Sequence, residues 1–177
     1  MAAIDHILFL VALCALFSLK DWRQLLVLLT AFTIGHSITL ALAILDVIPI
    51  NTRLVELLIP VTIMITAIYN VYILWRDKGF KQKSPRIQYL MALGFGWIHG
   101  MGFSNYLRST LFPGENLLGQ LFAFNIGIEI GQILILAKIL LLTFVFTQLL
   151  KIKRNHWAFT LSGVAFAVSL YLIFDQL

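Results

Sequence analysis

Long apolar runs alternate with short polar segments along the chain, and this pattern predicts helices that cross a membrane. An α-helix rises about 1.5 Å per residue, so about 20 mostly apolar residues cross the hydrocarbon layer of a bilayer. The sequence therefore predicts an all-α fold, a polytopic integral membrane helical bundle with a single transmembrane domain over residues 1–177. The six expected transmembrane helices are Ile4–Leu19, Leu25–Leu45, Leu54–Trp75, Ile87–Arg108, Leu117–Leu149 and Trp157–Phe174.

The composition supports a chain that resides in lipid. Hydrophobic residues make up 60% of the sequence and charged residues only 12%, whereas charged residues are about 25% of a typical soluble domain. The formal net charge of +5 is compatible with nucleic acid, but the basic residues lie between the apolar runs. That placement suits the anionic surface of a membrane. We therefore expect the lipid bilayer as a partner and no nucleic acid.

The basic residues are divided unevenly between the two sets of loops, and this predicts the orientation of the chain. Cytoplasmic loops of membrane proteins carry an excess of Lys and Arg. The opposite loops hold only Arg53 and Arg108, whereas alternate loops hold Lys20, Arg23, Arg76, Lys78, Lys81, Lys83, Arg86, Lys151, Lys153 and Arg154. The richer set is expected in the cytoplasm, which places both termini outside, in the inner (cytoplasmic) membrane of a bacterium.

Several ionisable side chains fall inside the predicted spans, where a charged group costs about 2.5–3.5 kcal/mol on insertion scales and is often functional. Counted by helical rise from the outer ends of their spans, His36 and His99 each lie about 13 Å deep and Glu129 about 18 Å. Asp5 and His6 open the first span from the same side. Four helices thus place these side chains in one layer, in the outer half of the bilayer.

Imidazole and carboxylate groups together suit a divalent first-row metal ion. The expected metal ligands are Asp5, His6, His36, His99 and Glu129. Because these ligand types accept several metals, nickel, cobalt, copper and zinc all stay open. The single cysteine, Cys14, lies in an apolar run and is expected to be a core residue.

Further polar residues are expected to support these ligands through hydrogen bonds. On the fifth span, Asn125, Glu129 and Gln132 are spaced as one polar stripe along a helix. The expected supporting residues are Ser37, Asn125, Gln132 and Glu56. A structural alternative stays open, because a buried histidine can hydrogen-bond a neighbouring helix and an acidic residue near a helix start, such as Asp5 or Glu56, favours the helix dipole.

Two glycine pairs predict places where helices approach each other closely. Gly96 and Gly100 lie on either side of His99, and Gly127 and Gly131 lie on either side of Glu129. The GxxxG spacing removes side chains from one strip of a helix, so a neighbouring backbone can approach it.

Five segments of the sequence carry a resemblance to a known family. They are DHILFL (Asp5–Leu10), TAFTIGHSITL (Thr30–Leu40), a glutamate that opens the third span (Glu56), HGMGF (His99–Phe103) and FNIGIEIGQ (Phe124–Gln132). In this order they resemble the HupE/UreJ family over nearly the whole chain. The resemblance implies a small multi-pass membrane protein associated with hydrogenase or urease accessory functions. It implies a metal permease, chiefly for nickel, with metal-handling roles for Asp5, His6, His36, His99 and Glu129.

Three functions are compatible with the sequence. The leading one is a metal-ion permease or metal-delivery protein whose site opens to the outer side; with no nucleotide-binding motif, its energy would come from a gradient or a partner. The second is an intramembrane zinc-dependent hydrolase that acts on a lipid-like substrate, because zinc held by histidine and carboxylate activates water. The third is a structural accessory membrane subunit. A homo-oligomer or a complex with an accessory protein is compatible with each.

Overall fold

The computed structural model describes residues 2–76, 85–110 and 116–176, and in these residues it contains helices and no strands. The elements are α1 (Ala2–Cys14), the short 3-10 helix η1 (Leu19–Asp21), α2 (Trp22–Ile44), α3 (Thr52–Arg76), α4 (Pro85–Thr110), α5 (Leu117–Phe144), the π-helical segment η2 (Val145–Leu149) and α6 (Arg154–Gln176). The prediction of an all-α bundle is confirmed.

Four helical segments in the described part of the chain are long and apolar enough to cross a membrane. They are Leu19–Ile44, Thr52–Arg76, Leu117–Leu149 and Arg154–Gln176. The two other predicted spans differ, because α1 is apolar but has only 13 residues, and α4 has 26 residues but a more polar sequence. These features make the chain a multi-pass helical membrane protein.

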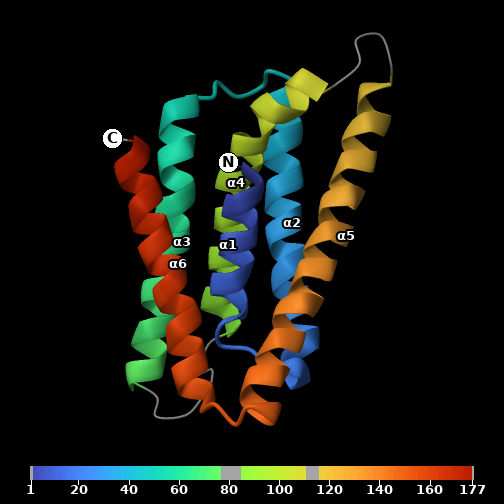
Figure 1. Ribbon diagram of the computed structural model, residues 1–177. Helices are drawn as coiled ribbons and strands as arrows, with labels where there is room; N and C mark the ends of the chain where they lie inside the picture. Colours follow the sequence, from blue (N-terminus) through green and yellow to red (C-terminus); the bar gives the residue numbers. More distant parts are fainter. Residues whose placement is uncertain (1, 77–84, 111–115, 177) are drawn as a thin grey trace.

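The short helix α1 lies in the middle of the bundle (Figure 1). Phe9, Leu10 and Cys14 on this helix are at most 1% exposed, so protein rather than lipid surrounds them. A helix enclosed in this way does not need the length of a lipid-facing span, and Cys14 is a core residue as predicted.

The end of α1 at Cys14 comes well before the predicted end of the first span. The side-chain amide of Asn70 on α3 donates a hydrogen bond to the carbonyl of Ala12 (2.7 Å). This bond satisfies one of the carbonyl groups that the end of a helix leaves open. The chain then turns, and the backbone amide and hydroxyl of Ser18 both donate to the carboxylate of Asp21 (2.9 and 2.8 Å) at the start of η1.

The helices α2 and α4 pack with their backbones in contact. A methyl group added at Gly96 or at Gly100 would overlap a backbone carbonyl of α2, so the predicted close approach at this pair is confirmed. A methyl group at Gly127 or Gly131 would meet nothing within 4 Å in the described part of the chain. The prediction of a close helix contact at the second pair is therefore wrong within this chain, because that strip of α5 has no helix packed against it.

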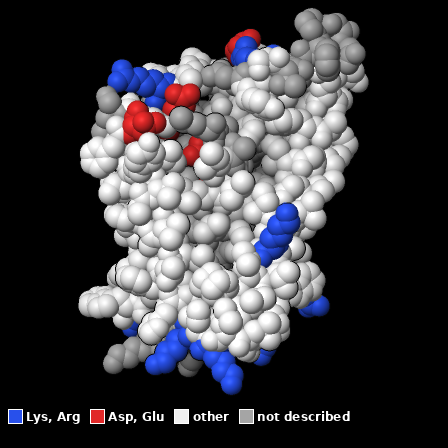
Figure 2. All heavy atoms as spheres, viewed as in Figure 1, with Lys and Arg blue, Asp and Glu red and all other residues white. Residues whose placement is uncertain are grey.

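The two ends of the bundle differ in charge. α1 begins and α6 ends at the same end of the bundle, which we name the terminal end (Figure 1). The turns between α1 and α2 and between α5 and α6 lie at the opposite end, which we name the basic end; its exposed side chains include Lys20, Arg23, Lys151 and Lys153. The Asp and Glu side chains visible in Figure 2 lie near the terminal end. Three predicted cytoplasmic residues lie outside the described residues, namely Lys78, Lys81 and Lys83.

Candidate metal site between three helices

Three histidines from three different helices meet inside the bundle. The ring centroid of His6 on α1 lies 5.4 Å from that of His36 on α2 and 4.9 Å from that of His99 on α4. The three residues are 8%, 0% and 0% exposed, respectively. We call these three residues the histidine cluster.

Phenylalanine rings enclose the histidine cluster. The ring centroid of Phe103 lies 4.6 Å from that of His6, and those of Phe32 and Phe9 lie 5.2 Å and 5.4 Å from that of His99. These apolar rings separate the imidazoles from bulk water, so a polar atom of the cluster has to find its partner inside the protein.

His99 is held by a hydrogen bond with Thr62 on α3, in which the hydroxyl oxygen lies 3.2 Å from Nε2. The hydroxyl proton of Thr62 is donated to the carbonyl of Ile59 (2.7 Å). The hydroxyl oxygen therefore accepts a hydrogen bond from Nε2–H, which fixes the neutral tautomer whose lone pair is on Nδ1. Within the described residues, Nδ1 is buried and has no hydrogen-bond partner.

The ring nitrogens of His36 have fewer hydrogen bonds than those of His99. Both of its ring nitrogens are buried and neither has a hydrogen-bond partner among the residues that the structure describes. An unsatisfied buried polar group costs about 1–3 kcal/mol, and most such groups in proteins are paired. Hydrogen bonding to another helix therefore does not account for the buried position of His36 within the described residues.

The three imidazole rings of the histidine cluster pack directly against one another in the structure. The rings of His36 and His99 meet that of His6 at interplanar angles of 89° and 74°. No group of three or more His, Cys, Asp or Glu side chains is arranged to hold a metal ion in residues 2–76, 85–110 and 116–176. Binding of a cation would therefore require the imidazole side chains to rotate from these positions.

A cavity of about 360 Å³ lies at the terminal end of the bundle. Its charged lining residues are Asp5, Arg53, Glu56 and Asp175, from α1, α3 and α6. Asp5 is 8% exposed and directly precedes His6 on α1, so the cavity lies beside the first turns of the helix that carries His6. The sequence did not single out Arg53 and Asp175, although the expected topology already placed both at the same end as Asp5.

The polar stripe of α5 faces α2. The hydroxyl of Ser37 donates to Asn125 (2.8 Å), and that of Thr33 donates to Gln132 (3.1 Å). These predicted supporting residues hold α5 against the helix that carries His36. Glu129 is partly exposed and forms no hydrogen bond or ion pair with a described residue, and the structure does not join it to the histidine cluster.

The fold and the site together define a class of protein, a multi-pass helical membrane protein with a buried cluster of histidines. The sequence matches the HupE / UreJ protein family over residues 1–175. The chain therefore belongs to the HupE/UreJ family, and this membership suggests an accessory membrane protein for nickel or cobalt. A search of the curated proteins found no match, and neither did a search of the solved structures.

Proposed function

We propose that the chain is a permease or metal-delivery protein for a divalent transition-metal cation, and that the histidine cluster binds this cation within the membrane. The supporting observation is the set of buried ring nitrogens on His36 and His99 that have no hydrogen-bond partner among the described residues. A neutral imidazole offers one lone pair, and nickel, cobalt, copper(II) and zinc all accept it. Family membership favours nickel or cobalt among these ions.

Thr62 supports this function because it orients one of the ligands. A ligating histidine commonly donates its other ring N–H to a neighbouring oxygen, which sets the tautomer and the direction of the ring. The contact of 3.2 Å between Thr62 and Nε2 of His99 has this form. It leaves Nδ1 of His99 as the atom that would bind the cation.

The cavity at the terminal end supplies an entrance to the histidine cluster. Its lining holds three carboxylates, from Asp5, Glu56 and Asp175, and one guanidinium, from Arg53. Three negative charges and one positive charge leave two negative charges, which attract a hydrated divalent cation. Asp5 then passes the cation to His6. With the basic end in the cytoplasm, this route runs from the outside inward.

Glu129 is kept as a candidate ligand that reaches the cation when α5 moves relative to α2. Such a movement would exchange the hydrogen bonds from Ser37 to Asn125 and from Thr33 to Gln132 for others. Glu129 would then supply the negative charge that balances a divalent ion among neutral imidazoles.

Elemental analysis of the detergent-purified protein after incubation with nickel tests the site. The wild type is expected to hold about one nickel ion per chain, and His36→Ala and His99→Ala are expected to lose it. His156→Ala is the matched control, because His156 is exposed near the start of α6. Nickel retained equally in all three variants would refute the proposed site.

Uptake of labelled nickel into liposomes then separates transport from the alternatives. Time-dependent uptake by the wild type that is absent in His36→Ala supports a permease. Binding without uptake favours a delivery protein. Zinc-dependent cleavage of a lipid would favour the hydrolase instead.

A further inference from the structure

A cavity of about 610 Å³ lies at the basic end of the bundle, between η1, η2 and the start of α6. We name it the basic cavity. Its lining residues come from two segments that are far apart in the sequence, within residues 18–20 and 143–154. Sites for small molecules in proteins measure about 300–1,000 Å³. The basic cavity is therefore large enough to hold a ligand.

The lining of the basic cavity is positively charged. Its charged residues are Lys20, Lys151, Lys153 and Arg154, and no carboxylate lines it among the described residues. Asp21 forms an ion pair with Arg154 (3.3 Å), whereas the three lysines form none with a described residue. Figure 2 shows Lys and Arg side chains at the basic end and no Asp or Glu side chain on the visible part of that end. Three positive charges therefore remain at the basic cavity, and they attract an anion.

The turn between η2 and α6 brings three of these cations together. Lys151 follows η2 with a φ of 56°, and the backbone amide of Ile152 donates to the carbonyl of Phe146 (3.0 Å). Glycine or asparagine is the usual residue with this conformation at a helix end, so the backbone does not explain the lysine. α6 begins at Arg154, so Lys151, Lys153 and Arg154 all reach the basic cavity from this one turn.

Contacts between distant segments hold the wall of the basic cavity in place. The guanidinium of Arg154 donates to the carbonyl of Leu16, beyond the end of α1 (2.8 Å). The indole N–H of Trp157 on α6 donates to the hydroxyl of Thr143 on α5 (3.1 Å), and the Trp157 ring stacks on that of Phe146 with 4.2 Å between centroids. The cavity is therefore shaped by contacts that need no ligand.

The basic cavity lies where three candidate membrane-spanning segments begin or end. These segments are Leu19–Ile44, Leu117–Leu149 and Arg154–Gln176. Two large apolar side chains line the cavity beside its charges, and both are exposed, Leu19 by 45% and Phe144 by 40%. A ligand with a negative head group and an apolar tail satisfies both parts of this lining.

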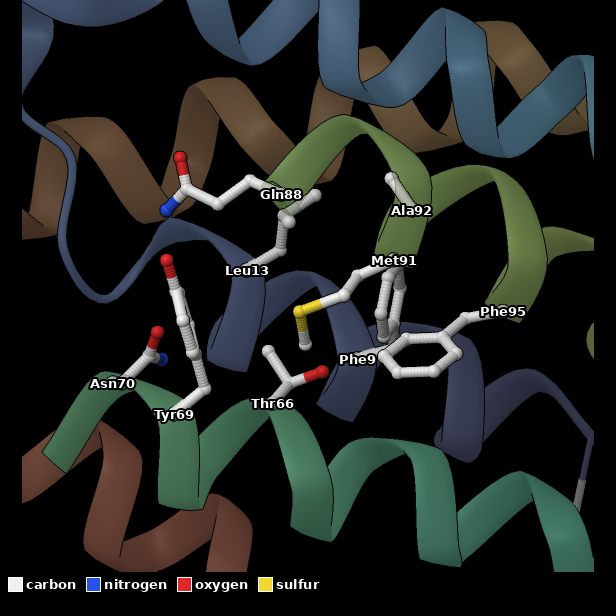
Figure 3. Close-up of a pocket in the computed structure, with 9 residues that line it drawn as sticks. All are labelled: Phe9, Leu13, Thr66, Tyr69, Asn70, Gln88, Met91, Ala92 and Phe95. Atoms are coloured by element: carbon white, nitrogen blue, oxygen red, sulfur yellow. The ribbon is translucent and has the colours of Figure 1, made fainter. Parts of the chain in front are cut away.

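A second cavity nearer the middle of the bundle has neither the size nor the charge of the basic cavity. It lies between α1, α3 and α4 (Figure 3) and has a volume of about 20 Å³, which holds about one water molecule. No charged residue lines it in the part of the chain that the structure describes. Positive charge is therefore a property of the basic cavity and not of the cavities in general.

We propose that the basic cavity binds the head group of an anionic phospholipid from the adjacent leaflet of the membrane. Basic pockets between membrane helices bind such head groups. Lys20, Lys151 and Lys153 contact the phosphate, and an acyl chain lies against Leu19 and Phe144. The bound lipid ties the turn after α1 to the ends of α5 and α6. This site is separate from the histidine cluster and does not depend on the proposed function.

Lipid binding by the purified full-length protein in detergent tests the proposal, with native mass spectrometry over a lipid titration as the measurement. The wild type is expected to bind dioleoyl phosphatidylglycerol about tenfold more tightly than dioleoyl phosphatidylcholine, which has the same acyl chains but no net charge. A lysine beside an anionic lipid strengthens binding about fivefold. The double variant Lys151→Gln/Lys153→Gln is therefore expected to raise the Kd for phosphatidylglycerol about 25-fold. Lys151→Arg/Lys153→Arg keeps both charges and should bind close to the wild-type level.

A matched control removes two positive charges outside the cavity. Arg23 and Lys138 are exposed and do not line it, so Arg23→Gln/Lys138→Gln should leave the Kd close to the wild-type value. Equal weakening by the two double Gln variants would show a general attraction of charge and overturn the site, as would equal binding of the two lipids by the wild type. Displacement of the lipid by excess inorganic phosphate would identify a free phosphate as the occupant and overturn the lipid assignment, whereas lipid retained under that excess supports it.

Discussion

The hydrogen bond between Thr62 and His99 allows a sharp test of how the site is built. Thr62→Val keeps the shape of the side chain but removes the oxygen that accepts from Nε2–H of His99. The ring N–H is then buried without a partner, which costs about 1–3 kcal/mol. In the unsubstituted chain the carbonyl of Ile59 accepts the hydroxyl proton of Thr62. In Thr62→Val this carbonyl keeps the backbone N–H of its helix as a hydrogen-bond donor. The perturbation therefore acts mainly on the tautomer and orientation of His99.

The expected effect on the affinity for nickel follows from the same contact. Loss of a hydrogen bond that orients a metal ligand typically lowers metal affinity 10–100-fold, and a tenfold change in Kd corresponds to about 1.4 kcal/mol. A nickel-binding isotherm on the purified protein should show this increase in Kd for Thr62→Val. Thr62→Ser, which restores the oxygen, should bind close to the wild-type level. Thr160→Val is the control, since Thr160 is exposed on α6. Nickel binding by Thr62→Val with the wild-type Kd would show that the contact does not orient a ligand.

Two further predictions concern stability. The methyl group added by Gly100→Ala overlaps the carbonyl of His36, so this variant should lower the unfolding free energy by about 1–3 kcal/mol. The methyl group added by Gly127→Ala meets no described neighbour, so this variant should raise the unfolding free energy by about 0.4–1 kcal/mol. Equal thermal shifts of the two variants in detergent would contradict the packing of α2 on α4. The guanidinium of Arg108 donates a hydrogen bond to the carboxylate of Asp46 and holds the pKa of Asp46 below its usual value. This pair therefore stabilises the fold at pH values above the pKa of the carboxyl group in the unfolded chain. The stabilisation is lost as the pH falls through the lower pKa of Asp46 in the folded chain. Asp46→Asn should therefore lower the Tm at neutral pH, with a difference from wild type that disappears in acid; a difference that persists in acid would assign the effect to another cause.

The positions of residues along the helix axes could be predicted from the sequence because the rise per residue is nearly constant. The helical rise places His36 and His99 at similar depths, and in the structure both rings contact that of His6. The rotation of a helix about its own axis could not be predicted in the same way. Asn125 and Gln132 bond to α2, but Glu129 between them is not joined to the histidine cluster. That angle depends on the packing of partners that are distant in the sequence.

The residues around the cavity at the terminal end show the same limit. Asp175 is an acidic residue at the end of an apolar helix, so it does not stand out in its own segment. Its position in the cavity depends on neighbours from other helices, such as Asp5 on α1 and Glu56 on α3. The early end of α1 has a similar origin, because the amide that satisfies its last turn belongs to α3.

The central position of α1 has a consequence for biosynthesis. This helix leaves the ribosome before the helices that enclose it, which include α3, α5 and α6. It can reach its final surroundings only after the remaining helices have been inserted. Because α1 carries His6, the histidine cluster is completed only when the helices that surround α1 have assembled around it.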